Sequence, residues 1–426
     1  MKTGGRPHAS IAADLREGWT RVSESAGTPA EPPQEPRRRR PWLRRTALGA
    51  AVAVLAAAGT GWALYQQLEG NIRTDRDTAR ELEQHSADRP AAVVHDALNI
   101  LLIGSDSRGG GNGAYGRDTG TQRSDTTILL HLSADRESAT AVSIPRDLMV
   151  DIPACTQPDG TRSEARFAQF NWAFEFAGAG CTIRTVEEFT GVRVDHHMIL
   201  DFSGFKNVVD AVGGVEVCLE EPVDDPEAQV TLPAGQQTLH GEDALGYVRA
   251  RYSIGDGSDT ERMARQQEFL GSLVRKVQSD GVLLNPGRLY DLLDSVTSSI
   301  TTDPGLASLQ DLYDLATSMR EMPSSGVRFL TVPRQPYQNN PNRDELVQPA
   351  ASQLFEALLH DRPVTVEPRA EEAHQNEQEG PGSGSASGSG TMGTESGAPP
   401  SGTPEAERDE GQPGYRGTTA ETGACV

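Results

Sequence analysis

The chain has 426 residues, of which 36% are hydrophobic, and it contains 44 Gly and 27 Pro. This composition is too polar and too rich in turn-forming residues for one compact body, so we expect folded blocks joined to disordered ones. Acidic residues outnumber basic ones by 61 to 39, and the net charge of -22 argues against general nucleic-acid binding through a basic surface.

The N-terminal region predicts a membrane anchor. Residues 1–45 lack apolar periodicity and carry six arginines near their end, which is typical of a disordered basic arm in the cytoplasm. Residues 46–68 carry no charge and, at about 1.5 Å per residue, form a helix that can cross a hydrocarbon core of about 30 Å. Trp42, Trp62 and Tyr65 lie near its two ends, and the arginines favour a cytoplasmic N-terminus. A cleaved signal peptide is the alternative, but its apolar region is usually about 7 to 15 residues long.

The rest of the chain predicts an α/β domain on an extracellular stalk. The stalk is residues 69–96, which are charged and polar, and the folded body starts near Leu98. Short apolar runs predict strands at 98–103, 126–132, 139–144, 215–219 and 327–332. Helical patterns cover 172–176, 185–189, 205–212, 259–278, two segments within 291–319, and 345–359. Strands interleaved with helices predict a layered α-β-α domain with a central mixed sheet.

Composition sets the limits of the folded blocks. We expect one domain at 97–280, a C-terminal extension of it at 281–366, and a disordered, acidic, Gly/Ser/Pro-rich tail at 367–426.

Four cysteines fit an exported protein. Cys155 and Cys181 flank a polar excursion, so a disulfide between them is predicted for an oxidising compartment. Cys218 lies in an apolar run and is interpreted as a small buried side chain, whereas Cys425 lies in the tail. The sequence has no CxxC motif or His/Cys cluster, which argues against a structural zinc site.

Two aspartates are candidate metal ligands. Asp106 follows the first predicted strand and Asp125 precedes the second, and ligands in open α/β sheets collect beyond strand ends. Mg²⁺ prefers oxygen ligands and usually takes one or two carboxylates plus phosphate oxygens. The alternative is that both aspartates cap turns. The glycine-rich loop 109–113 matches no nucleotide-binding motif.

Several arginines are candidate anion ligands. Arg146 lies just past a predicted strand, and an extended chain would place Arg249 and Arg251 on one face. Two adjacent guanidinium groups repel each other unless an anion lies between them, and their planar forks suit phosphate or pyrophosphate. The alternative is that each arginine pairs with a surface carboxylate.

The predicted helix 259–278 carries polar groups on its apolar side. At 100° per residue, Arg262 and Gln266 lie within or at the edge of the apolar face, where a charge needs a buried partner or a water-lined cleft. Arg265 lies off this face and is expected to be solvated. The pair His196 and His197 has no accompanying nucleophile motif, which favours a structural role.

A series of segments in one order resembles the LytR-CpsA-Psr family of bacterial envelope proteins. They are NILLIGSDSR, RSDTTILLHL, SIPRDLMVDIP, FNWAFEFAGAGC, VDHHMILDFSGFKNVVDAVGGVEVCL, LHGEDALGYVRARY and DTERMARQQEFL. The resemblance covers about residues 97–280, with a less specific extension to about 365. It implies a phosphotransferase that moves a glycopolymer from a polyprenyl-pyrophosphate carrier to peptidoglycan and releases polyprenyl phosphate. It also implies an apolar pocket for the polyprenyl tail.

The resemblance assigns roles to residues of this chain. Asp106 and Asp125 become ligands of Mg²⁺, with Mn²⁺ as the alternative ion. The pyrophosphate-binding groups become Arg123, Arg146, Arg249, Arg251, Arg262 and Gln266. We assign the catalytic roles to Asp106, Arg146 and Arg249, with Asp106 as general base, although a metal-bound carboxylate is a weak base. The family often carries a lysine where this chain has Gln169.

Two other functions compete with the ligase. The domain could bind polyprenyl-phosphate lipids without turnover, as a sensor or scaffold, but the paired aspartates and the arginines favour chemistry. A transcriptional attenuator is disfavoured because the domain is predicted to lie outside the cell and no helix-turn-helix stands out in the arm.

Overall fold

The computed structural model describes residues 41–106, 124–157, 159–251, 257–279, 286–320, 322–368 and 414–421. The chain divides at Thr60–Gly61 into two units. Helix α1 (Pro41–Asn71) contains the predicted span, and its segment Arg45–Asn71 is long and apolar enough to cross a membrane. The remaining elements belong to the second unit.

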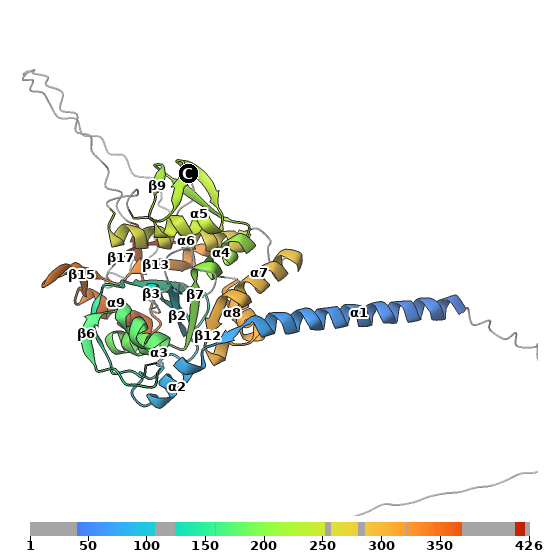
Figure 1. Ribbon diagram of the computed structural model, residues 1–426, viewed down its shortest axis with the longest axis horizontal. Helices are drawn as coiled ribbons and strands as arrows, with labels where there is room; N and C mark the ends of the chain where they lie inside the picture. The colour runs from blue at the N-terminus through green and yellow to red at the C-terminus, as the bar shows by residue number, and fades with distance from the viewer. Residues whose placement is uncertain are drawn as a thin grey trace, which may run out of the picture. The chain divides into compact units, whose positions relative to one another are not determined.

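Within the described residues, nine strands form a central mixed sheet in the order β1-β12-β7-β2-β3-β4-β13-β17-β16 (Figure 1). The strands are β1 (Arg73–Thr74), β2 (Leu98–Ser105), β3 (Ser124–Leu132), β4 (Ala139–Ile144), β7 (His196–Asp201), β12 (Ile300–Thr302), β13 (Val327–Thr331), β16 (Val366–Pro368) and β17 (Tyr415–Thr419). Strand β3 is antiparallel to β2 and β4, whereas β7 is parallel to β2 and β13 is parallel to β4. The predicted mixed sheet is confirmed.

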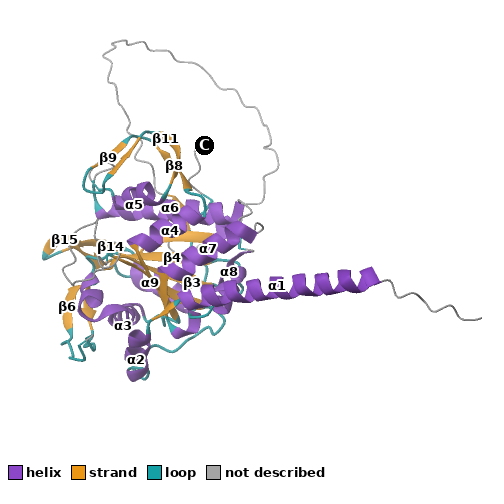
Figure 2. Cartoon of the chain, turned by 45° about the vertical axis from the view of Figure 1, so that its right-hand side comes forward, coloured by secondary structure: helices purple, strands orange, loops and turns teal. Residues whose placement is uncertain are grey.

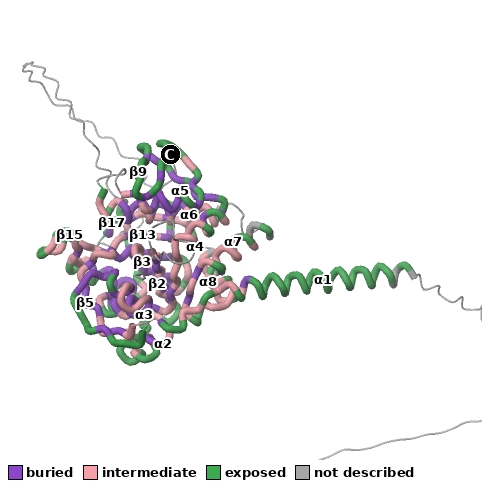
Figure 3. The backbone as a smooth tube through the Cα atoms, in the orientation of Figure 1, coloured by how far each residue is buried: buried purple, intermediate pink, exposed green. Residues whose placement is uncertain are grey.

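Helices cover both faces of the sheet (Figure 2). They are α2 (Arg76–Gln84), α3 (Asn171–Thr190), α4 (Phe202–Ala211), α5 (Gly241–Arg249), α6 (Asp259–Ser279), α7 (Pro286–Ser299), α8 (Leu309–Arg320) and α9 (Ala350–Leu359). Because strand side chains alternate between faces, Leu101 and Ile103 pack with α3 and α9, while Ile100 and Leu102 pack with α6 and α8. The buried residues therefore form cores on the two sides of the sheet (Figure 3), as the predicted α-β-α layering requires.

Short antiparallel ladders complete the second unit. They are β5 (Met149–Ile152) with β6 (Arg166–Gln169), β8 (Val215–Leu219) with β11 (Gly235–Leu239), β9 (Val223–Asp225) with β10 (Val230–Leu232), and β14 (Arg334–Tyr337) with β15 (Asn340–Leu346). The ladders of β8 to β11 pack with α4, α5 and α6 in a third core. Helix α6 therefore contributes Phe269 to this core and Leu270 to the core on the sheet.

The predicted stalk is wrong for residues 73–84. Strand β1 pairs with β12, and α2 packs on α3 with Glu81 buried and accepting a hydrogen bond from Arg184 Nη1 at 2.8 Å. The segment has few apolar residues, of which Leu82 packs against the core beside α3. Its polar groups bond to partners from the later chain, which the local sequence does not reveal.

The predicted featureless tail is wrong for Tyr415–Thr419. This segment is β17, which pairs with β13 on one side and β16 on the other. Ala420 is fully buried, and its carbonyl accepts a hydrogen bond from Arg275. The five-residue strand is too short to stand out beside the composition of the preceding segment.

Two helix predictions need smaller corrections. The segments predicted at 172–176 and 185–189 both lie in α3, where non-helical backbone at Ala177 and Gly178 separates two helical segments, with a φ of 69° at Gly178. The second helical segment is longer than predicted, because it extends from this kink to Thr190. The closing helix α9 begins at Ala350 instead of residue 345, because a residue before proline, here Gln348, is disfavoured in helical conformation.

The disulfide between Cys155 and Cys181 is present, with a Cα–Cα distance of 5.6 Å. Cys218 is exposed on β8 and is disulfide-bonded, so its interpretation as a small buried side chain is wrong. His196 contacts Asp303 at 3.1 Å and the buried His197 contacts Asp75 at 3.3 Å, as expected for structural histidines.

Candidate functional site

A pocket of about 480 Å³ lies between the central sheet and helices α4, α5 and α6. One part of its lining is apolar and comes from both the sheet and the helices: Leu102, Met198, Leu200, Phe205, Leu245, Val248, Phe269 and Leu270. Another part is charged and combines four arginines with four carboxylates: Arg146, Arg249, Arg251, Arg262, Asp125, Asp201, Asp225 and Glu227. One cavity thus combines an apolar wall with a group of guanidinium side chains, a combination that suits an amphipathic anion.

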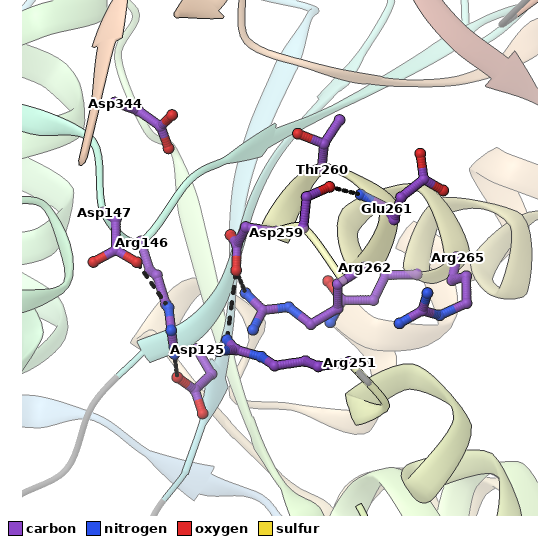
Figure 4. A network of polar contacts seen from close by, with 12 residues as sticks. Asp125, Arg146, Asp147, Arg251, Asp259, Thr260, Glu261, Arg262, Arg265 and Asp344 are labelled. Carbon is purple, nitrogen blue, oxygen red and sulfur yellow. Dashed lines mark hydrogen bonds and ion pairs between the residues drawn. The ribbon is translucent and has the colours of Figure 1, made fainter. Parts of the chain in front are cut away.

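Arg146 lies at the end of β4, where Pro145 stops the strand, and it is held by two carboxylates (Figure 4). Its Nη1 donates to Asp125 Oδ1 at 3.0 Å, and its Nε donates to Asp147 Oδ2 at 3.2 Å. Burial lowers the pKa of Arg146, but the charges of Asp125 and Asp147 outweigh it and raise the pKa overall. The guanidinium is therefore fixed in position and permanently charged.

Asp259, the first residue of α6, holds two further arginines (Figure 4). Its Oδ1 lies 2.6 Å from Arg262 Nη2 and 3.5 Å from Arg251 Nη2. Burial raises the pKa of Asp259, although Arg146 and Arg251 act in the opposite direction. The carboxylate thus draws together arginines that would otherwise repel each other.

This cluster contains unsatisfied polar atoms. Within the part of the chain that the structure describes, Asp259 Oδ2 and Arg262 Nε are buried without a hydrogen-bond partner. Buried polar groups are normally paired, so each such atom needs an explanation, and a ligand that is not present is one of them. An anion beside Arg262 would supply an acceptor for its Nε.

Arg249 and Gln266 line the same pocket. Arg249 ends helix α5, so the predicted extended chain is wrong at this residue, and its guanidinium lies 4.8 Å from the centre of the Phe202 ring. Gln266 Nε2 donates to the carbonyl of Val248 at 3.1 Å. The cation–π contact of Arg249 thus joins α5 to α4, and the hydrogen bond from Gln266 joins α6 to α5 at the pocket wall.

The predicted arginine set is largely brought together. Arg146, Arg249, Arg251, Arg262 and Gln266 line one cavity, as does the predicted metal ligand Asp125. Arg262 has the buried partner that its position on α6 requires. Arg265 is buried, with its guanidinium bonded to the carbonyl of Ala250, so its expected solvation is wrong.

Arg123 and Asp106 are the remaining predicted site residues. Arg123 lies outside the described residues. Asp106 directly follows β2, and the pairing of Ser105 with Ser124 places it at the same end of the sheet as Asp125. In the described part of the chain, no group of three or more His, Cys, Asp or Glu side chains could hold a metal ion. A hard cation would therefore need phosphate or water oxygens besides these two carboxylates.

Sequence reasoning missed three contributors to the site. Asp259 stands three residues before Arg262, a spacing that pairs side chains on a helix and could have revealed it. Asp147 accepts hydrogen bonds from Gln169 Nε2 at 2.9 Å and from Arg343 Nη1 at 3.2 Å. Arg343 comes from β15, and no local sequence signal connects it with Asp147.

A family model, described as the LytR_cpsA_psr family, matches residues 64–359. Cell wall biosynthesis protein LcpA of Corynebacterium glutamicum is 33% identical over 321 residues, which cover 69% of this chain and 60% of LcpA. The probable cell wall biosynthesis protein LcpB of that organism is 38% identical over 252 residues, which cover 57% of this chain and 56% of LcpB. The chain thus spans less than two thirds of the length of these relatives.

The match covers a larger share of a shorter relative. Polyisoprenyl-teichoic acid–peptidoglycan teichoic acid transferase TagU of Enterococcus faecalis is 29% identical over 63% of this chain and 80% of TagU. Among solved structures, TagT bound to LI-WTA superposes with a TM-score of 0.48 at 24% identity, over 64% of this chain and 96% of that chain.

Proposed function

Because this chain belongs to the LytR-CpsA-Psr family, we propose that it is a membrane-anchored phosphotransferase that joins a glycopolymer to peptidoglycan. The donor is a glycopolymer on a polyprenyl-pyrophosphate carrier, and the product lipid is polyprenyl phosphate. The observation that carries the proposal is that Arg146, Arg251 and Arg262 line one pocket together with an apolar wall. The similarity to TagU, a polyisoprenyl-teichoic acid–peptidoglycan teichoic acid transferase, supports the same reaction class.

The charged and apolar parts of the pocket bind different parts of the donor. The arginines bind the pyrophosphate, and Arg262 Nε gains a phosphate acceptor that it lacks among the described residues. The polyprenyl chain lies against the apolar lining, which includes Leu245, Phe205 and Phe269. This arrangement fixes the pyrophosphate at the charged part of the cavity and keeps the lipid out of water.

The reaction is a substitution at phosphorus. A hydroxyl oxygen of peptidoglycan forms a bond to the phosphorus that carries the glycopolymer, and the bond from this phosphorus to the bridging oxygen breaks. Polyprenyl phosphate leaves with that oxygen, and the hydroxyl proton passes to a base, for which we propose Asp106. The arginines stabilise the charge that develops on the leaving phosphate.

We propose that Asp106 and Asp125 hold Mg²⁺, with Mn²⁺ as the alternative ion. Their places at one end of the sheet, on adjacent strands, suit a cation that takes its remaining ligands from phosphate and water. When bound, the ion would neutralise pyrophosphate charge.

We further propose that α1 anchors the chain in the cell membrane, with the N-terminus in the cytoplasm and the catalytic domain outside. The arginine-rich flank before the span and the disulfide between Cys155 and Cys181 support this orientation.

The test uses the full chain in lipid nanodiscs with a polyprenyl-pyrophosphate oligosaccharide and peptidoglycan fragments. Release of polyprenyl phosphate coupled to sugar transfer is expected with Mg²⁺ and not with a chelator. Arg146→Ala should lower kcat/KM at least about 100-fold, the usual effect of removing one transition-state donor. Arg362→Ala is the matched control, because Arg362 pairs with Glu356 at the surface and does not line the pocket.

The competing function is a sensor or scaffold that binds the lipid without turnover. Tight, saturable lipid binding with no metal-dependent release across a broad panel of acceptors would favour it and overturn the ligase.

A further inference from the structure

An aromatic pair lies on the surface beside the arginine site. Phe167 of β6 is 52% exposed, and its ring lies 6.0 Å from that of Tyr337 of β14. Beyond helix α1, Trp172, which packs edge-on against Phe176, and Tyr313 of α8 are also exposed. The exposed Phe167 and the half-buried Tyr337 thus form a ring pair at the surface, and apolar surface of this kind is a candidate binding site.

The turn next to this pair is uncharged and rich in amides. The segment from Gln335 to Asn342 reads QPYQNNPN and contains no Asp, Glu, Lys or Arg, in a chain with a net charge of -22. Asn339 Nδ2 donates to Tyr337 Oη at 2.9 Å, so the amides and the ring belong to one surface. Amide groups both donate and accept hydrogen bonds, which matches the hydroxyl and acetamido groups of a neutral sugar. The flanking Arg334 and Arg343 donate to the carboxylates of Asp344 and Asp147, so their charges are already paired and do not favour a phosphate or an acidic peptide at this turn.

Hydrogen bonds connect this surface to Arg146, the proposed catalytic arginine. Gln169, two residues after Phe167 and hence on the same face of β6, donates to Asp147, which holds Arg146. Arg343 of β15 donates to the same carboxylate, and the backbone N–H of Asp344 donates to the carbonyl of Asp147 at 3.1 Å. In Figures 1 and 2, β6 and β15 lie near each other, away from α7.

The carboxylates that connect this surface to Arg146 lie on the other side of Arg146 from Arg251 and Arg262. Asp125, Arg251 and Arg262 line the pocket, but Asp147, Gln169 and Arg343 do not. Figure 4 shows Asp147 and Asp344 on one side of Arg146, and Arg251 and Arg262 on the opposite side. In a phosphoryl transfer the attacking and leaving oxygens are roughly in line across phosphorus. With the leaving lipid in the pocket and the reacting phosphate bound at Arg146, an in-line acceptor would arrive from the side away from the pocket, where Asp147 lies.

We propose that Phe167, Tyr337 and the amides of the β14–β15 turn bind the glycan strand of the acceptor peptidoglycan. The inference rests on the proposed function, because that function defines an acceptor and the side from which it arrives. The rings would stack on the C–H faces of sugar rings, which are drawn to the negative face of an aromatic ring. The amides would bond to the polar edges of the sugars, and the strand would be guided toward Arg146.

The test uses the full chain in nanodiscs with Phe167→Ala, Tyr337→Ala and the double variant. Tyr313→Ala is the matched control, because Tyr313 is 56% exposed and belongs to α8. We measure sedimentation with insoluble peptidoglycan sacculi, the KM for soluble peptidoglycan fragments, and the affinity for the polyprenyl-pyrophosphate donor. Thermal unfolding midpoints verify that each variant is folded.

The double variant should bind sacculi about tenfold more weakly and show a similar rise in acceptor KM, with donor affinity and kcat unchanged. Tyr313→Ala should behave as the unmodified chain. Unchanged acceptor binding would overturn the proposal, and so would a fall in donor affinity, which would assign the surface to the donor's glycan. If the unmodified chain shows no transfer, the proposed ligase fails, but loss of sacculus binding in the double variant alone would still support the glycan surface.

Discussion

Asp259→Asn tests whether the arginine cluster is built to receive an anion. The substitution keeps the size of the side chain and removes the charge that lies 2.6 Å from Arg262, a side chain only 7% exposed. Breaking a buried ion pair usually costs about 3 to 5 kcal/mol. The lower end is expected, about 3 kcal/mol, because burial raises the pKa of Asp259 and the ionised carboxylate is itself poorly solvated.

Inorganic pyrophosphate should reverse much of this loss. A ligand at 100 times its Kd stabilises a protein by about 2.7 kcal/mol. In the unmodified chain a bound anion competes with the Asp259 carboxylate for Arg251 and Arg262, whereas in the variant it does not. The gain in unfolding free energy on adding pyrophosphate should therefore be larger in the variant, and urea titrations with and without pyrophosphate measure it.

Asp361→Asn is the control for this experiment. Asp361 Oδ1 lies 3.0 Å from Nε2 of the buried His131, and Asp361 does not line the pocket. This variant should be destabilised without gaining any additional response to pyrophosphate. Equal pyrophosphate responses in the unmodified chain and in Asp259→Asn would refute the reasoning.

Three further predictions concern the pocket, pH and the disulfide. Leu245→Trp should weaken donor-lipid binding at least about tenfold and leave inorganic pyrophosphate binding unchanged, since the side chain lines the apolar wall; an equal loss of both would contradict separate sites for tail and head group. Burial raises the pKa of Asp75, but hydrogen bonds from His197 and Thr78 outweigh it and lower the pKa to about 2. Asp75 therefore contributes about 2 kcal/mol of stability above pH 4 that is lost as the pH falls toward 2, and urea unfolding of Asp75→Asn should lack this loss. Replacing Cys155 and Cys181 with serine, which opens a loop with a sequence separation of 26, should lower the unfolding free energy by about 3 kcal/mol; a change below 1 kcal/mol would show that the folded contacts hold the excursion without the bond.

Local sequence signals predicted the elements whose secondary structure does not depend on which other elements they pack against. The run Ala139–Ile144 is entirely buried, and its residues indicate a strand whichever neighbours it has. The site was predictable to the same degree, because Arg146 follows that strand and Arg262 needs a partner wherever the helix packs.

The failures arise where a distant segment decides the environment. A helical projection places Arg265 on the polar side of α6, yet α6 packs between the sheet and the β8–β11 ladder, so both of its sides are covered. Polar segments such as residues 73–84 are folded by ion pairs and strand pairing with residues more than 100 positions away. Neither relation leaves a pattern in the segment itself.

The position of β17 changes what a C-terminal truncation means. Pro368 and Gly417 are register partners on adjacent parallel strands, so the chain leaves the sheet and returns to it at the same edge. A shortened expression clone that stops at residue 368 would remove a strand lying between β13 and β16, not a dispensable end. For the same reason, the sheet cannot be completed during synthesis until the ribosome has released Thr419 from its exit tunnel.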